Sequence, residues 1–184
     1  GRLLNILGED HKLQSKQVSI ALQELDTQPP EVVFYAFTKL ADGKMSTRRG
    51  NVVYMDDLLD EAQVRAYAVV KEIRADLPEE RLQEISDAVG ISATRFNIAR
   101  ISPDKGITFR WSDALSLEAD SAPFIMYSHA RACSIHRKAG KVDTSVGLDI
   151  SALEGSAGEL VRRMAYMNEE LQTAIDSASP HQFC

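Results

Sequence analysis

The spacing of apolar and polar positions in the first third of the chain is typical of an α/β sheet. Residues 3–7 form a nearly continuous apolar run that ends at Gly8, and residues 32–37 form a second run rich in β-branched and aromatic side chains. Between them, apolar residues recur at helical spacing. This order predicts two buried strands of a parallel sheet joined by a helix. Ligands of such sheets bind at the carboxyl ends of the strands, where residues 8–11 would lie.

From residue 56 onward the apolar spacing is mainly helical. Asp56 is the expected N-cap of a helix whose apolar stripe runs from Leu59 to Ile73. Pro78 is expected at the first position of the next helix, and Gly90 is expected to end that helix.

A short strand and two longer helices are predicted in the second half. Residues 107–111 alternate with period two, and residues 122–138 have the pattern of a helix. Residues 156–159 have the form of a capping box ahead of a further amphipathic helix. Met164 and Met167 have core spacing in that helix, and we expect them to pack inside. The whole pattern predicts an α/β region followed by a mostly α region.

The composition narrows the class of protein. The chain has 184 residues, 44% of them hydrophobic, which suffices for one or two domains with real cores. No apolar run approaches the roughly 18 residues of a membrane span, and the first residues do not form a signal peptide. We therefore expect a cytoplasmic protein without a membrane partner. Cys133 and Cys184 are too few for a disulfide framework or a metal site, and we expect no protein-bound metal or organic cofactor.

The net charge of −6 argues against bulk attraction to nucleic acid, but the charge is unevenly distributed. Residues 44–55 and residues 121–142 contain no acidic side chain. Their basic side chains, with two histidines in the second window, are Lys44, Arg48, Arg49, His129, Arg131, His136, Arg137, Lys138 and Lys141. Each window is either a solvated face or a binding surface for anions.

Residues 43–51 are the segment richest in candidate chemistry. Lys44 offers a point charge, Ser46 offers a hydroxyl donor, and the flanking glycines allow close backbone approach to a phosphate. The residue order of a Walker loop is absent. These residues alone leave two alternatives, an anion-binding loop and an inert surface turn.

The string Lys-Met-Ser-x-x-x-Gly-Asn at residues 44–51 resembles the Lys-Met-Ser-Lys-Ser signature loop of class I aminoacyl-tRNA synthetases. The longer string of residues 43–53 is similar to the form found in arginyl-tRNA synthetases. Three further segments resemble the same family in the same order: residues 7–12, residues 102–109 and residues 120–131. The resemblance covers essentially the whole chain.

The resemblance implies an arginine–tRNA ligase. Such an enzyme joins arginine to ATP as arginyl-adenylate and then transfers the arginyl group to the terminal adenosine of its tRNA. The implied partners are tRNA(Arg), ATP with Mg²⁺ and L-arginine. By resemblance, Lys44 and Ser46 are the catalytic residues of the first step. The implied ATP-binding residues are Gly8, Asp10, His11, Lys44, Met45, Ser46 and Arg48, and the implied tRNA-binding residues are Tyr127, Arg131, Arg137 and Lys138.

The chain departs from the family pattern in two places. Thr47 stands where the common loop has its second lysine, and either Arg48 or Arg49 is left to supply that charge. The His-x-Gly-His signature of class I synthetases is absent, because none of the four histidines has another three positions away. We therefore expect the chain to be part of a longer enzyme and to be inactive alone.

The resemblance predicts three regions. Residues 1–60 would be the end of a Rossmann-like catalytic domain, residues 61–118 a helical stem-contact region, and residues 119–184 the start of an α-helical anticodon-binding bundle. Two alternatives remain from the residues: a class I synthetase for another amino acid, since the loop is shared across the class, and a non-catalytic tRNA-binding module.

Overall fold

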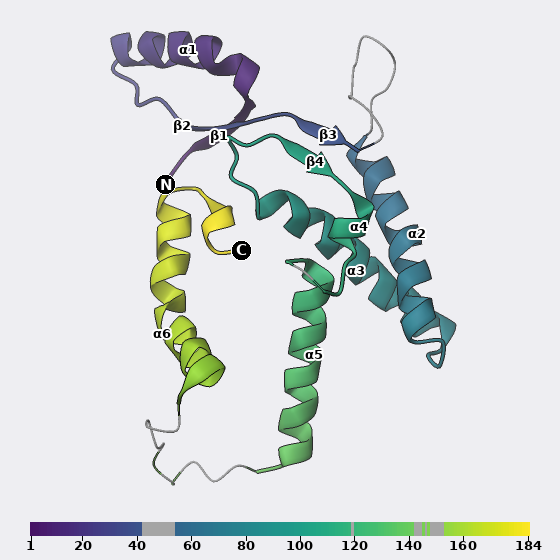
Figure 1. Cartoon of the computed structure of the whole chain (residues 1–184). Helices are drawn as coiled ribbons and strands as arrows, with labels where there is room; N and C mark the ends of the chain where they lie inside the picture. Colours follow the sequence, from purple (N-terminus) through teal and green to yellow (C-terminus); the bar gives the residue numbers. More distant parts are fainter. Residues whose placement is uncertain (42–53, 119, 142–144, 146, 148–152) are drawn as a thin grey trace.

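The computed structural model describes residues 1–41, 54–118, 120–141, 145, 147 and 153–184. The elements follow in chain order in Figure 1: β1 (Leu4–Gly8), η1 (Glu9–His11), α1 (Lys12–Glu24), β2 (Glu31–Tyr35), β3 (Thr38–Leu40), α2 (Met55–Ile73), α3 (Glu79–Ala99), β4 (Ile107–Phe109), α4 (Trp111–Ala114), α5 (Ala122–Ala139), α6 (Gly155–Asp176) and η4 (Pro180–Gln182). The predicted fold class, α/β followed by mostly α, is confirmed.

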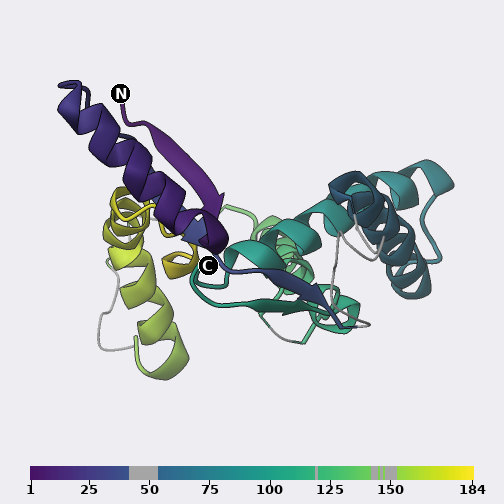
Figure 2. The ribbon, with the colours of Figure 1, turned by 90° about the horizontal axis from the view of Figure 1, so that it is seen from above.

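The first two strands pair in parallel, as the strand–helix–strand pattern predicts. Leu4 lies opposite Glu31, and Gly8 lies opposite Tyr35. Figure 2 shows α1 lying along β1, and the Lys12 ammonium sits 5.9 Å from the centre of the Phe34 ring. The helix between the strands therefore returns the chain to the same end of the sheet, as a parallel crossover requires.

The prediction that these strands are buried is wrong for the face opposite α1. Leu4 is 41% exposed and Ile6 is 69% exposed. The side chains of a strand alternate between its two faces, and a parallel sheet is normally covered on both. Among the described residues α1 covers only the face of Asn5 and Leu7, and the face of Leu4 and Ile6 lines an open groove.

A second parallel pair follows directly from the first. The chain passes from β2 to β3 through two residues, and Thr38 of β3 lies opposite Ile107 of β4. The Ala36 amide also donates to the Pro103 carbonyl at 2.7 Å. The pattern of residues 107–111 predicts β4, but Trp111 already begins α4, and β3 has no comparable sequence signal.

The core lies where α2 crosses α3. Ala66 and Val70 of α2 pack against Leu82 and Val89 of α3, which confirms the predicted apolar stripes except at Ile73, whose side chain is 54% exposed. The prediction that Gly90 ends this helix is wrong, since α3 continues to Ala99.

Gly90 is instead the point of closest approach between the two helices. A Cβ on Gly90 would stand 2.7 Å from the Ala62 carbonyl oxygen and 2.9 Å from the Gln63 amide nitrogen. Glycine is therefore present so that the α2 backbone fits against α3, and this tertiary contact overrides the local tendency of glycine to end a helix.

The predicted starts of two helices are also wrong. α2 begins at Met55, so Asp56 lies inside the first turn and does not cap it. α6 begins at Gly155, so Ser156 is likewise already helical and forms no capping box. In both cases the residue with extended backbone that caps the helix lies before the polar residue that the sequence pattern favours as the cap. These N-cap residues are Tyr54 for α2 and Glu154 for α6. Asp56 instead places its negative charge in the first turn, where the helix dipole favours it.

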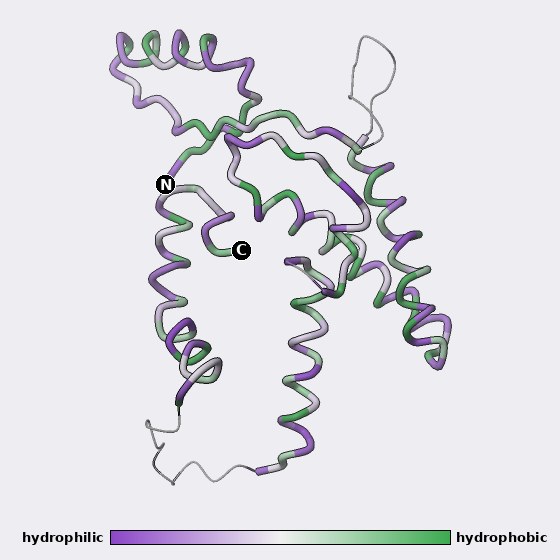
Figure 3. Tube along the Cα trace, in the orientation of Figure 1, coloured by the Kyte–Doolittle hydropathy of each residue, from purple (hydrophilic) through white to green (hydrophobic). Residues whose placement is uncertain are grey.

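The last two long helices extend from the body of the molecule in the same direction and lie apart (Figure 1). The start of α5 packs on the helical core through Met126. Figure 3 shows apolar positions spaced along the length of α6. Met164 and Met167 are 64% and 48% exposed, so the prediction that they pack inside does not hold among the described residues. No helix in the described part of the chain is both long and apolar enough to cross a membrane.

Candidate functional site

The carboxyl end of β1 brings three of the predicted ATP-binding residues together. Gly8 ends the strand and is buried, and the η1 turn that follows carries Asp10 and His11. A Cβ on Gly8 would stand 2.6 Å from Asp10 Oδ1, with Tyr35 Oη 3.9 Å away. Glycine thus lets the Asp10 carboxylate fold back over the strand end, although the φ of Gly8, −61°, is one that any residue adopts.

The two polar side chains of this strand end form a loose, solvent-exposed pair. His11 Nε2 lies 3.8 Å from Asp10 Oδ2, and both side chains are more than half exposed. An exposed pair at this distance adds little stability, so both groups are available to a ligand. The arrangement offers a carboxylate acceptor and an imidazole beside exposed backbone, which suits the hydroxyl and amine groups of a nucleoside.

Tyr35 is a site neighbour that sequence reasoning missed. Its strand partner is Gly8, and its hydroxyl lies beside the same turn. The pairing register brings Tyr35 to this turn, because it places the last residue of β2 opposite the last residue of β1. The apolar run of residues 32–37 does not show where β2 ends.

The remaining predicted ATP-site residues, Lys44, Met45, Ser46 and Arg48, lie outside the described residues. They fall in the sequence between β3, which ends at Leu40, and α2, which begins at Met55.

The segment 102–109 is one of the four that carry the family resemblance. It consists of a tight turn followed by strand β4, which pairs with β3. Its tight turn is closed by a hydrogen bond from the Ser102 hydroxyl to Asp104 and by the Lys105 amide donating to the Ser102 carbonyl at 2.9 Å. The Ser102 hydroxyl lowers the pKa of the Asp104 carboxyl from its ordinary value by stabilising the charged form. The turn therefore fixes the start of β4 beside β2 and β3.

The predicted tRNA-binding residues all lie on α5. Ser121 caps this helix, since its hydroxyl accepts a hydrogen bond from the Phe124 amide at 3.2 Å. Tyr127 is 52% exposed, and the Arg131 guanidinium lies 5.8 Å from the centre of its ring. This distance is within cation–π range, so the two side chains present one flat, cationic surface.

The spacing of four and seven residues puts Tyr127, Arg131 and Lys138 along one face of α5, with Arg137 on the neighbouring side. All four are exposed. Arg137 and Lys138 lie in the last turn, where cations also stabilise the helix through its dipole. The geometry thus fits stacking on an unpaired base and contacts to phosphate oxygens. Figure 1 shows this helix well away from the strand end that carries Gly8.

Comparison with known proteins shows which family the chain belongs to. A model of the family "tRNA synthetases class I (R), catalytic domain" matches residues 5–105, more than half of the chain. The chain belongs to the class I arginyl-tRNA synthetase family. A model of the DALR anticodon-binding domain matches residues 125–184 of this arginyl-tRNA synthetase family member.

Curated relatives carry the same family name. An arginine–tRNA ligase of Methanocella arvoryzae is 46% identical over 183 residues, which are 98% of this chain and 32% of that protein. An arginine–tRNA ligase of Methanothermobacter thermautotrophicus is 46% identical over 163 residues, 89% of this chain and 29% of that protein. The chain therefore spans about a third of the length of these relatives.

A solved structure agrees with the described fold. Thermus thermophilus arginyl-tRNA synthetase superposes with a TM-score of 0.81 at 29% identity, over 98% of this chain and 30% of that one. Arginyl-tRNA synthetase from Plasmodium falciparum gives a TM-score of 0.59 at 14% identity, over 76% of this chain and 23% of that one, which shows the shared fold alone.

Among the described residues no group of three or more His, Cys, Asp and Glu side chains is arranged to hold a metal ion.

Proposed function

We propose that the complete protein containing this chain is a cytoplasmic arginine–tRNA ligase, and that these 184 residues are inactive alone. The observation that carries the proposal is the combination of two family matches in one chain, a catalytic domain over residues 5–105 and an anticodon-binding domain over residues 125–184. The absence of a His-x-Gly-His string and the coverage of about a third of the relatives support inactivity of the isolated chain.

We propose that residues 1–60 are the end of the catalytic domain, residues 61–118 a stem-contact region and residues 119–184 the first part of the anticodon-binding domain. The anticodon-domain match over residues 125–184 supports the third region, whereas the catalytic-domain match over residues 5–105 covers the first region and continues into the second. The α2–α3 core, which also receives Met126, joins the middle region to the start of the last one.

In the first step the arginine carboxylate attacks the α-phosphorus of ATP, and pyrophosphate leaves. Negative charge accumulates on the phosphates, so catalysis consists mainly of placing cations and donors around them. We propose Lys44 for the phosphate contact, with Ser46 as a supporting donor and Met45 and Arg48 lining the same loop. Mg²⁺ enters with ATP as part of the substrate, and no protein ligand is assigned to it.

The strand end is proposed as the adenosine side of the pocket. Gly8 leaves the space that the Asp10 carboxylate occupies, and this exposed carboxylate is placed to accept a hydrogen bond from a ribose hydroxyl. His11 lies on the same turn and is proposed to contact the nucleoside.

In the second step a ribose hydroxyl of the terminal adenosine of the tRNA attacks the carbonyl carbon of arginyl-adenylate, the bond to the phosphate breaks, and AMP leaves. We propose that α5 holds the tRNA during this step, with Tyr127 and Arg131 stacking on a base and Arg137 and Lys138 contacting phosphates.

The loop assignment is tested by Lys44→Ala in the complete protein. Removing one preorganised donor to the phosphates costs about 2–4 kcal/mol of transition-state stabilisation, so arginine-dependent pyrophosphate exchange should fall at least thirtyfold. Lys39→Ala, which removes an exposed lysine of β3, is the matched control and should leave the exchange unchanged. Exchange at the normal rate in Lys44→Ala would remove the catalytic role of this lysine.

A further inference from the structure

One guanidinium joins the start of the sheet to its second strand. Arg2 lies just before β1, and its Nε and Nη2 donate to the two carboxylate oxygens of Glu31 at 2.8 and 2.7 Å. Glu31 begins β2, and its amide donates to the Leu3 carbonyl at 3.0 Å. The bidentate fork therefore fixes the direction of the Arg2 side chain, which a lysine would not do.

The same guanidinium also closes the end of α6. Arg2 Nη1 donates to the Ile175 carbonyl and Nη2 donates to the Asp176 carbonyl, each at 2.6 Å. The last carbonyls of a helix lack partners within the helix and carry its partial negative charge, so they favour a cation. A residue 173 positions from Ile175 in the sequence thus adds side-chain donors to the last carbonyls of this helix, of which the Ile175 oxygen also accepts the Ala178 amide at 3.2 Å.

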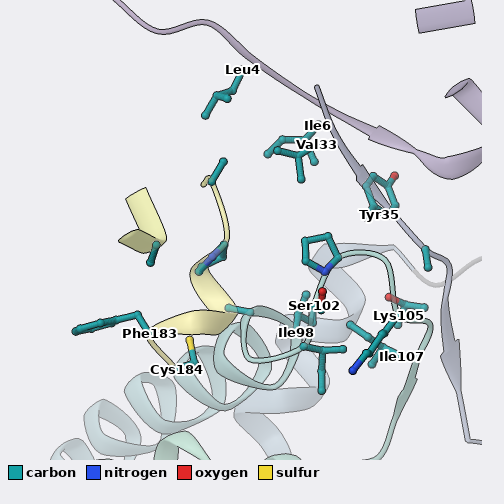
Figure 4. A pocket seen from close by; sticks show the side chains of 18 of the residues that line it. Leu4, Ile6, Val33, Tyr35, Ile98, Ser102, Lys105, Ile107, Phe183 and Cys184 are labelled. Atoms are coloured by element: carbon teal, nitrogen blue, oxygen red, sulfur yellow. The ribbon is translucent and has the colours of Figure 1, made fainter. Parts of the chain in front are cut away.

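Side-chain packing between the sheet and α6 leaves a groove next to this bridge. Leu4, Ile6 and Val33 line one side of a groove of about 790 Å³, and Ala174 and Ile175 of α6 line the other. Figure 4 shows the labelled side chains of the sheet facing the chain end across this space. Beside this groove, the four hydrogen bonds of Arg2 join the edge of the sheet to the end of α6.

We propose that Arg2 is a positioning residue that couples the anticodon-binding region to the candidate ATP site. It grips α6, which belongs to the matched anticodon-binding domain, and it precedes β1, which ends at Gly8 beside Asp10. β1 is a short, hydrogen-bonded strand, so a displacement at its first residue is transmitted to its last. The proposal rests on the function proposed above, because it needs an enzyme that reads an anticodon and charges a tRNA.

The test uses the complete protein with Arg2→Ala, Arg2→Lys and a matched control. Arg162→Ala is the control, since it removes an exposed arginine of α6 whose ion pair with Glu159 stays within the helix. Two quantities are measured: amide hydrogen exchange over residues 172–178, and the ratio of kcat/KM for tRNA(Arg) to kcat/KM for the same tRNA with an altered anticodon. The ratio does not depend on the fraction of active enzyme, so partial unfolding alone leaves it unchanged.

In Arg2→Ala we expect faster exchange at the end of α6, and the anticodon ratio to fall by about fivefold or more, the scale of ordinary coupling between sites. In Arg2→Lys both quantities should lie between those of Arg2→Ala and those of the unaltered protein, because three donors on a flexible side chain cannot make four fixed hydrogen bonds. Arg162→Ala should match the unaltered protein. A normal ratio in Arg2→Ala, or an equal loss in Arg162→Ala, would overturn the coupling. If the unaltered protein charges no tRNA, the proposed function fails. Normal amide hydrogen exchange over residues 172–178 in Arg2→Ala would refute the Arg2 bridge whether or not the protein charges tRNA.

Discussion

The crossing of α2 and α3 at Gly90 makes a sharp prediction for Gly90→Ala. The added methyl group would stand 2.7 Å from the Ala62 carbonyl oxygen, 2.8 Å from its carbon and 2.9 Å from the Gln63 nitrogen. These are backbone atoms, so no side-chain rotation relieves the clash. Alanine is better than glycine inside a helix by about 1 kcal/mol. Overpacking a tight contact costs about 1–3 kcal/mol, and three backbone contacts below 3.0 Å place this case at or above the upper end.

The net expectation is a loss of about 2 kcal/mol in the free energy of opening the α2–α3 pair. Amide exchange in the two helices, measured in the complete protein, should accelerate roughly thirtyfold. Gly106→Ala is the control, because its new Cβ would stand at an ordinary 3.5 Å from the Phe37 carbonyl oxygen. Its effect should stay within about 0.5 kcal/mol. Unchanged or slower exchange in Gly90→Ala would refute the close approach of the helices.

Three further results are expected in the complete protein. Ser121→Ala should cost about 1 kcal/mol of local stability at the start of α5, seen as faster exchange of its first turn, while Ser121→Thr should retain the cap. Neutralising Arg137 and Lys138 together should reduce the slope of log tRNA affinity against log salt by about one to two, and an unaltered slope would exclude phosphate contacts. Arg2 donates to Glu31 and so lowers the pKa of that carboxyl below its ordinary 4.5. This stabilisation is present above pH 4.5 and is lost as the pH falls through the lowered pKa. The protection of the amides at the end of α6, taken relative to the intrinsic exchange rate at each pH, should therefore fall there, and Glu31→Gln should remove this fall.

Periodicity predicted the parallel β1–β2 pair, the helices α2, α5 and α6, and α3 as far as Gly90, because these signals are local. The apolar positions of a strand or helix can be identified from its own sequence. Ala66 and Val70 lie on the stripe predicted for α2, and both are buried in the core. The carboxyl end of β1 follows from the same logic, since the end of a parallel strand is fixed once the strand is placed.

The predictions fail where residues far away in the sequence determine the local structure. Gly90 has the local signature of a helix end, and only the α2 backbone against it explains why the helix continues. Leu4 and Ile6 have the composition of a buried strand, but burial depends on what else covers the sheet. Arg2 carries no signal at all, because its partners lie 29 and more than 170 residues away.

The candidate site also has a part that local sequence patterns predict and a part that they do not place. Gly8, Asp10 and His11 lie together because they fall within four residues at a strand end, and the exposed face of α5 brings Tyr127 and Arg131 together by helical spacing. The part that rests on the signature loop stays a prediction from the sequence.

The central claim is tested most directly by pyrophosphate exchange with the complete protein, ATP, Mg²⁺ and tRNA(Arg), run with each amino acid in turn. We predict that arginine alone supports exchange above background. Exchange with a different amino acid would make the protein a class I synthetase of another specificity. Absence of exchange with every amino acid, together with retained tRNA binding, would make it a non-catalytic tRNA-binding protein, and either result would contradict the proposed function.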